Sequence, residues 1–121
     1  MERLIKSGKG WRIGWDRSAP KYQGLVGDDN WAIELSEAEL NDFCRLLLNL
    51  AETMAQMSAE LMSEERIAIE AETELLWMEV EGFPDDYCLR LILSGDRRCE
   101  AYWSRSAIKD LIVACQNLKT Y

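Results

Sequence analysis

Two stretches of the chain repeat apolar residues at the spacing of an α-helix. In residues 36–62 apolar side chains recur every three or four positions, and Ser36 followed by Glu39 forms the capping-box pattern that starts a helix. Residues 106–118 repeat the apolar pattern over a shorter span. We therefore predict one long and one short amphipathic helix. The apolar stripes consist of Leu40, Phe43, Cys44, Leu47, Leu50, Ala51, Met54, Met57 and Leu61 in the first, and Ile108, Leu111, Ile112, Cys115 and Leu118 in the second.

Most of the remaining chain alternates apolar and polar residues, which is typical of half-buried β-strands. Four strands are predicted before the long helix, at residues 4–6, 11–15, 22–26 and 31–35. Four more are predicted before the short helix, at residues 67–72, 75–81, 87–93 and 99–103. The alternation changes parity near Thr73 and Glu74, and this one-residue slip separates the fifth strand from the sixth.

Each group of four strands ends in a helix, so the chain contains a weak internal repeat of ββββα units at about residues 3–62 and 66–118. The junctions also align, because Ser36 matches Ser104. Chance similarity is the alternative to a true duplication. We predict an α+β fold in a single domain of residues 1–121, with two antiparallel sheets and both helices packed on them.

The sixth and seventh strands have one register that keeps an apolar face, and it places Val80 opposite Leu89. This register leaves residues 83–86 as a four-residue loop. On the other face it sets Glu79 opposite Arg90. A cross-strand partner thus explains Arg90, and a grip on an anionic ligand is the alternative interpretation.

Composition excludes several classes of function. The 121 residues contain no histidine, which removes histidine-based acid–base catalysis, Ser–His and Cys–His nucleophiles and histidine metal sites. No apolar run approaches the ~20 residues that span a bilayer, and the N-terminus lacks the apolar segment of a secretion signal. We expect a cytoplasmic protein without membrane contact, metal or cofactor.

The four cysteines, Cys44, Cys88, Cys99 and Cys115, show no C-x-x-C spacing. Cys44 and Cys115 fall on the predicted apolar stripes of the helices. We therefore expect reduced, mostly buried thiols. No activating base is visible for a catalytic cysteine.

The formal net charge of -8 is distributed unevenly along the chain. Residues 1–27 carry +4, residues 28–86 carry -15 and residues 87–121 carry +3. One interpretation is a solvated acidic helix with the basic ends folded against it. The alternative is a basic face, built from both ends, that holds an anionic partner. The net acidity disfavours non-specific nucleic-acid binding, which depends on neutralising phosphates.

Four blocks of sequence carry a resemblance to a known family: GWRIGWD, GLVGDDNWAIELSEAELNDFCRLL, ELLWMEVEG and LRLILSGDRRCEAYW. Over about residues 3–116 the chain resembles an uncharacterised cyanobacterial family of small proteins, catalogued as a domain of unknown function. The resemblance implies a fold similar to the Whirly-type regulators, which bind single-stranded DNA and are built from ββββα units. It implies no activity, cofactor or catalytic residue. The basic Lys-Gly-Lys-Ala type motif of the Whirly proteins is missing, with only Gly8-Lys9-Gly10-Trp11 in its place.

The sequence assigns no function, and three classes remain open. We favour a non-enzymatic protein-interaction or scaffold protein, with Trp77 as the aromatic residue expected at the surface because it shares a strand face with Glu79 and Glu81. The other tryptophans, Trp11, Trp15, Trp31 and Trp103, are predicted to fill the core. The alternative is single-stranded nucleic-acid binding, and the second alternative is an enzyme of unassigned chemistry. The candidate interaction residues are Trp77, Arg90, Lys9, Arg12, Arg97, Arg98 and Arg105.

Overall fold

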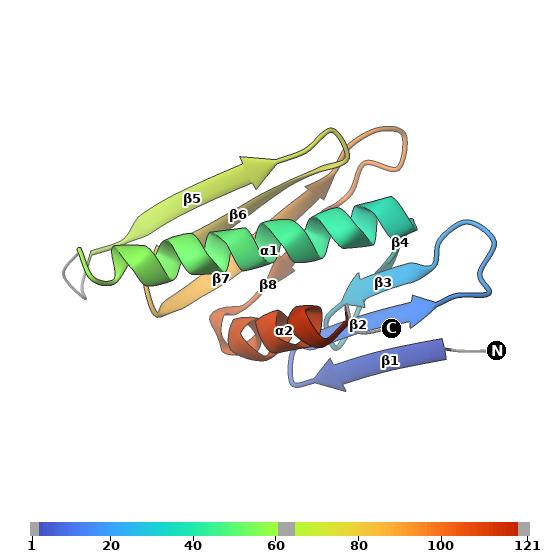
Figure 1. The fold of residues 1–121 in the computed structure, drawn as a ribbon, viewed down its shortest axis with the longest axis horizontal. Coiled ribbons are helices and arrows are strands. Elements are labelled where there is room, and N and C mark those ends of the chain that lie inside the picture. The colour runs from blue at the N-terminus through green and yellow to red at the C-terminus, as the bar shows by residue number, and fades with distance from the viewer. Residues whose placement is uncertain (1–2, 61–64, 119–121) are drawn as a thin grey trace.

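The computed structural model describes residues 3–60 and 65–118 and begins with a four-stranded antiparallel sheet, here called sheet A (Figure 1). Its strands follow one another in space in chain order. The helix α1 (Glu37–Met57) comes next. The strands of sheet A are β1 (Arg3–Gly8), β2 (Trp11–Asp16), β3 (Gly24–Gly27) and β4 (Ala32–Leu35).

A second antiparallel sheet, sheet B, repeats this arrangement and is followed by the helix α2 (Arg105–Leu118). Its strands, again in chain order, are β5 (Ile67–Glu72), β6 (Leu76–Phe83), β7 (Asp86–Leu93) and β8 (Glu100–Trp103). Two antiparallel four-stranded sheets and two helices confirm the predicted α+β fold.

Local signals in the sequence account for where the elements begin. The Ser36 hydroxyl accepts a hydrogen bond from the backbone N–H of Glu39 at 3.2 Å, and the Glu39 carboxylate accepts one from the N–H of Ser36 at 2.8 Å. The predicted capping box is therefore confirmed. The predicted register of β6 and β7 is also confirmed, with Val80 opposite Leu89 and Glu79 opposite Arg90.

Several predicted boundaries were wrong, and three of them have a local structural reason. The long helix ends at Met57 rather than at residue 62, because the Ser58 hydroxyl bonds the Ala55 carbonyl and the chain turns. Residues 61 and 62 lie outside the described residues. The loop between β6 and β7 is shorter than predicted, because Phe83 and Asp86 already pair. Strand β3 begins at Gly24 instead of residue 22, since the Gln23 side chain bonds the Ala19 carbonyl within the preceding loop.

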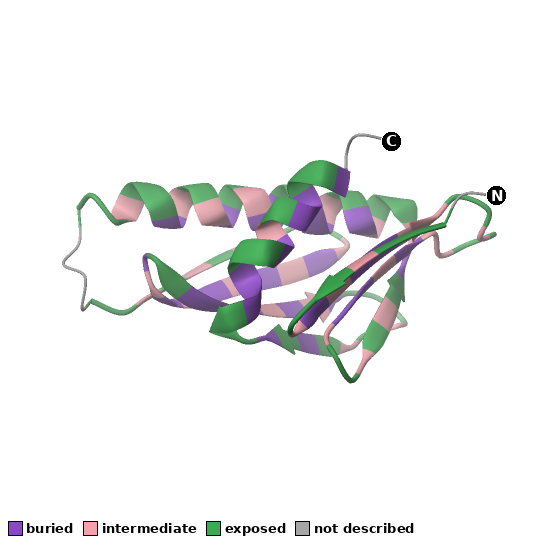
Figure 2. Ribbon diagram, turned by 90° about the horizontal axis from the view of Figure 1, so that it is seen from below, coloured by how far each residue is buried: buried purple, intermediate pink, exposed green. Residues whose placement is uncertain are grey.

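Both helices lie on the same side of the two sheets (Figure 1), and the buried residues gather where the helices face the strands (Figure 2). One cluster of buried side chains contains residues from both sheets and both helices. Its largest fully buried members include Trp103, Phe43 and Met54. Leu40, Leu47, Leu50 and Met54 of the predicted stripe are buried in this cluster, whereas Met57 is only half-buried and residue 61 lies outside the described residues. Trp15 and Trp31 are only partly buried against it.

Trp103 connects the two sheets. Its indole N–H donates to the Gly27 carbonyl of β3 at 2.8 Å, and the side chain is 1% exposed. Its ring packs at a tilt against Trp31, with centroids 5.2 Å apart, and against Phe43 of α1, at 5.6 Å. A single side chain at the end of sheet B thus contacts sheet A and the long helix.

Arg97 makes a second connection between the sheets. From the turn between β7 and β8, its guanidinium donates to the Glu34 carbonyl of β4 at 2.7 Å and to the Glu39 carboxylate. It also lies 4.2 Å from the centroid of the Tyr22 ring. Glu39 therefore serves the helix cap and this ion pair together.

We expect Trp103→Phe to lower the free energy of unfolding by roughly 2–4 kcal/mol, because it leaves the buried Gly27 carbonyl without its donor and leaves a void. Urea denaturation of the variant and the wild type measures the difference. Trp77→Phe, a half-exposed position, is the control and should cost less than about 1 kcal/mol. Equal losses in the two variants would contradict the role assigned to Trp103.

Candidate interaction surface

The strands of sheet B present one face to the helices and leave the other open. Leu76, Met78 and Val80 of β6 are fully buried on the inner face, while the residues between them alternate onto the opposite side. Both helices pack on the inner side (Figures 1 and 2). Among the described residues, no helix covers the outer face of sheet B.

The register arranges the outer face in three rows that run across the strands. Each row is made of directly opposite residues, taken in order from β5 to β8. The rows are Glu72–Trp77–Ile92–Glu100, Glu70–Glu79–Arg90–Tyr102 and Ala68–Glu81–Cys88. Trp77 and Ile92 therefore form an apolar pair with a carboxylate at each side, and Tyr102 is 52% exposed at the edge strand.

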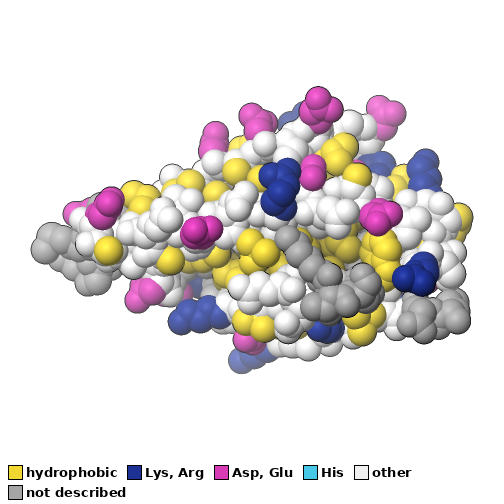
Figure 3. All heavy atoms as spheres, in the orientation of Figure 1, with side chains coloured by type: hydrophobic (Ala, Val, Ile, Leu, Met, Phe, Trp, Pro, Cys, Tyr) yellow, Lys and Arg dark blue, Asp and Glu magenta, His cyan; other side chains and the backbone are white. Residues whose placement is uncertain are grey.

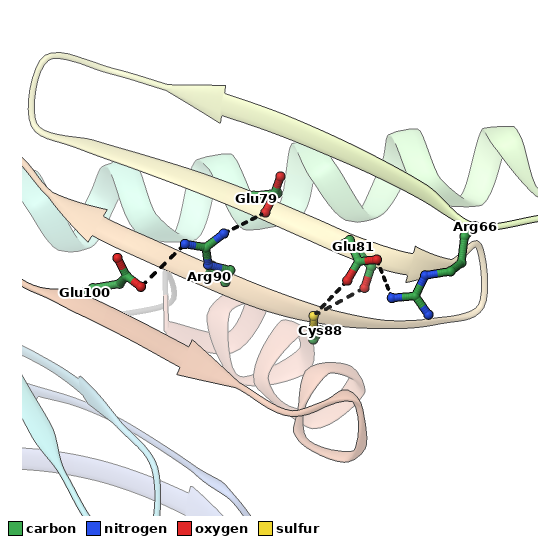
Figure 4. Close-up of polar contacts among 6 residues, drawn as sticks. All are labelled: Arg66, Glu79, Glu81, Cys88, Arg90 and Glu100. Carbon is green, nitrogen blue, oxygen red and sulfur yellow. Dashed lines mark hydrogen bonds and ion pairs between the residues drawn. The ribbon is translucent and has the colours of Figure 1, made fainter.

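Arg90 lies at the centre of this face (Figure 4). Its guanidinium contacts the Glu79 carboxylate at 3.3 Å and the Glu100 carboxylate at 3.4 Å, so it joins three strands. It also lies 5.6 Å from the centroid of the Trp77 ring. The predicted partner Glu79 is confirmed, and the arginine is engaged by carboxylates on both sides.

Glu81 organises the end of the face near the β6–β7 turn (Figure 4). Arg66, just before β5, pairs with its carboxylate, and the Cys88 thiol donates to its backbone carbonyl at 3.3 Å. Cys88 is 8% exposed although it lies on the outer side. Partial burial raises the pKa of the neighbouring Tyr102 phenol, and Cys88 acts in the same direction.

The outer face is acidic. The three rows contain five glutamates and one arginine, and Arg66 adds a second cation at the margin. Glu70 and Glu79 lie directly opposite each other on neighbouring strands. Like charges in this position repel each other. Of these two glutamates, Arg90 pairs with Glu79, so it offsets only part of the repulsion. The surface therefore carries an excess of negative charge that a bound cation would offset.

Two of the cations predicted for an interaction surface have structural roles elsewhere. Arg12 donates to the backbone carbonyls of Asp28 and Trp31, at 2.7 and 2.8 Å, and so holds the turn between β3 and β4. Arg97 connects the sheets, as described above. Their guanidinium groups are satisfied within the fold.

Apart from Arg90, the remaining three predicted cations are exposed at separate places. Arg105, at the start of α2, pairs with Asp86 at 3.2 Å. Lys9 lies in the turn between β1 and β2, and Arg98 lies in the turn before β8. The structure brings Trp77 and Arg90 together but distributes the remaining candidates over different elements.

None of the four cysteines forms a disulfide, and Cys44, Cys88 and Cys115 are buried as predicted. Cys99 is partly exposed, and burial nevertheless raises the pKa of its thiol. Within residues 3–60 and 65–118, no three Cys, Asp or Glu side chains are grouped so that they could hold a metal ion. None of the described helices is long and apolar enough to cross a membrane.

Residues 6–118 match the family described as a domain of unknown function, DUF1818. The chain belongs to the DUF1818 family. This confirms the expected membership of an uncharacterised family. No curated protein matches the DUF1818 chain.

A solved structure shares the DUF1818 fold described here. It is the crystal structure of a protein of unknown function from the cyanobacterium Prochlorococcus sp. NATL2A, whose description assigns it to the DUF155 family. The two chains are 31% identical, with a TM-score of 0.90 over 96% of this chain and 98% of the other. The neighbour is itself of unknown function, so the likeness supports the fold without naming an activity. The expected likeness to Whirly-type regulators stays a prediction.

Tyr102 and Glu100 belong to the outer face of this DUF1818 protein but were not among the predicted site residues. The alternation of apolar and polar residues in β8 indicates where both side chains point. Ala101 and Trp103 are core residues, so their neighbours must point to the opposite face. The pairing of β8 with β7 is also needed to bring Glu100 to Arg90.

We expect Arg90→Ala to lower the free energy of unfolding by about 1 kcal/mol, because it removes two partly exposed ion pairs and uncovers the Glu70–Glu79 repulsion. The loss should shrink as salt is raised in urea denaturation. Arg98→Ala removes an exposed arginine outside these contacts and should change the stability by less than about 0.5 kcal/mol. A loss of several kcal/mol for Arg90→Ala that salt does not change would contradict this assignment.

Proposed function

We propose that this protein is a non-enzymatic interaction protein and that the outer face of sheet B binds a cationic segment of a protein partner. The observation that carries the proposal is the open row in which Trp77 and Ile92 lie between Glu72 and Glu100. An apolar centre with a charged margin is the usual composition of a binding surface. The excess of carboxylates selects a positively charged partner.

The spacing of the row defines the partner further. Neighbouring strands lie about 4.8 Å apart, so the Glu72 and Glu100 backbones at the two edge strands are separated by roughly 14 Å. An extended chain advances ~3.3 Å per residue, and alternate side chains point the same way. A segment with two cations four residues apart and an apolar residue midway between them therefore fits across the row.

The carboxylates of this face support leaving catalysis out of the proposal. Glu79, Glu81 and Glu100 pair with guanidinium groups, while Glu70 and Glu72 are exposed on an open sheet. Acid–base catalysis by paired carboxylates needs an environment that separates their pKa values, such as an enclosed apolar site. We also propose a cytoplasmic location, and this part of the proposal rests on the sequence alone.

Single-stranded nucleic acid is the weaker candidate. Arg12, Arg97, Arg90 and Arg105 contact backbone carbonyls or carboxylates within the protein. On the side seen in Figure 3, Lys and Arg side chains are scattered among Asp and Glu side chains and do not form a basic patch. A polyanion would have to break these pairs, whereas a cationic peptide keeps them.

We expect the peptide Lys-Ser-Leu-Ser-Lys-Ser-Leu-Ser-Lys to bind the outer face of sheet B. Two-dimensional NMR should show the largest shifts at the Trp77 indole N–H and at Ile92 and Tyr102. The same peptide with Glu in place of Lys is the matched control and should produce no saturable shift. Shifts that concentrate on the helices, or equal responses to both peptides, would contradict the proposal.

The double substitution Trp77→Ala/Glu100→Lys should weaken this binding at least about fivefold, because it removes the aromatic contact and reverses one edge charge. Val113→Ala/Glu52→Lys makes the same types of change at exposed positions on the helices and should alter the affinity less than about twofold. A comparable loss in both variants would mean that net charge, and not this face, governs binding.

A mixed-sequence single-stranded oligonucleotide should bind no more tightly than roughly 10 µM at about 150 mM salt, because most of the arginines are already paired. Fluorescence anisotropy across a salt series measures this affinity. Sub-micromolar binding that falls steeply with salt, and that is lost in Lys9→Glu/Arg98→Glu at two exposed positions, would favour nucleic acid as the partner.

A further inference from the structure

A cleft lies away from the outer face of sheet B. It is a cleft of about 600 Å³ between the first half of α1, the end of α2, and the end of β2 with the loop that follows it. Its apolar lining includes Trp15 of β2, Leu40 of α1 and Leu118 of α2. Its volume falls within the range of small-molecule sites, and none of the outer-face residues lines it.

The charged lining of this cleft is unusual for so acidic a chain. Arg17, from the loop after β2, and Arg45, from α1, both line it, against the single carboxylate of Glu37 among the described lining residues. Residues 28–86 contain only two cations, Arg45 and Arg66, beside seventeen carboxylates, and one of these two cations lies at the cleft. The cleft is thus locally positive in a protein of net charge -8.

Both arginines are available to a ligand. Arg17 is exposed, and Arg45 has one weak partner, the Asp42 carboxylate at 3.4 Å, with its own side chain 52% exposed. Two guanidinium groups from separate elements therefore line one space.

We infer that this cleft binds a small amphipathic anion, with a ring or short hydrocarbon body against Trp15, Leu40 and Leu118 and an acidic group between Arg17 and Arg45. The apolar lining supplies contact area for the body. The two guanidinium groups supply charge-assisted hydrogen bonds to a carboxylate, sulfonate or phosphate. The Gln23 amide also lines the cleft; its NH₂ group donates to Ala19. This NH₂ group gives an NMR signal by which binding in the cleft can be followed.

The test uses the aromatic sulfonate 8-anilinonaphthalene-1-sulfonate with the complete chain. Fluorescence titration should show one saturable site per molecule, and NMR should show shifts at the Gln23 side-chain amide and the Trp15 indole. Arg17→Gln/Arg45→Gln should weaken binding roughly tenfold, because both charge-assisted contacts are lost at a partly exposed site. The uncharged N-phenyl-1-naphthylamine should lose less than about threefold in the same variant.

Arg66→Gln/Arg98→Gln is the matched control, since it removes the same charge outside the cleft and should change the affinity less than about twofold. Circular dichroism and the urea midpoint establish that each variant is folded. If the double variant is destabilised, Arg17→Gln and Arg45→Gln are measured singly, each with an expected loss of about threefold. The inference is overturned if the sulfonate does not saturate one site, if both double variants respond equally, or if the NMR shifts lie on the outer face of sheet B.

Discussion

The hydrogen bond from the Trp103 indole to the Gly27 carbonyl is the constraint on which the arrangement of the two sheets depends. Each sheet is a simple antiparallel meander whose strands pair only with strands of the same sheet. The indole reaches from the end of β8 to β3 and packs on Phe43, so one side chain sets sheet B, sheet A and α1 against one another. Arg97 holds the same two sheets from the β7–β8 turn. With the sheets fixed in this way, the outer face of sheet B stays clear and the helices share the other side.

Much of the fold follows from signals that act over a few residues. The Ser36–Glu39 capping box and the register of β6 and β7 depend on neighbouring side chains and strand parity, and both were predictable. The Trp103–Gly27 bond joins residues 76 positions apart and leaves no periodic trace in the sequence. The end of α1 was missed for a different reason, since the apolar repeat runs on beyond the point at which Ser58 turns the chain.

The candidate sites, like the fold, were predictable only where neighbouring residues determine them. Trp77 and Arg90 were predictable because their strand parity and one cross-strand pair place them on a polar face. The cleft was not predicted, because Arg17, Arg45 and Leu118 come from a loop and two helices whose packing only the tertiary structure provides. The alternative interpretation, a basic face that holds an anionic partner, did not anticipate that Arg12 and Arg97 make internal contacts. The sequence alone does not distinguish an arginine that binds a ligand from one that donates to a backbone carbonyl within the fold.

The opposed carboxylates of Glu70 and Glu79 give the outer face a thermodynamic property of its own. Their repulsion is present in the folded state, in which β5 and β6 hold them side by side, and is largely lost when the strands separate. A cation bound between them relieves a cost that folding itself imposes. Binding of a cation to this face and the local opening of β5 and β6 are therefore linked equilibria. Amide hydrogen exchange in these two strands should slow when a partner binds, even a partner that binds too weakly to be isolated.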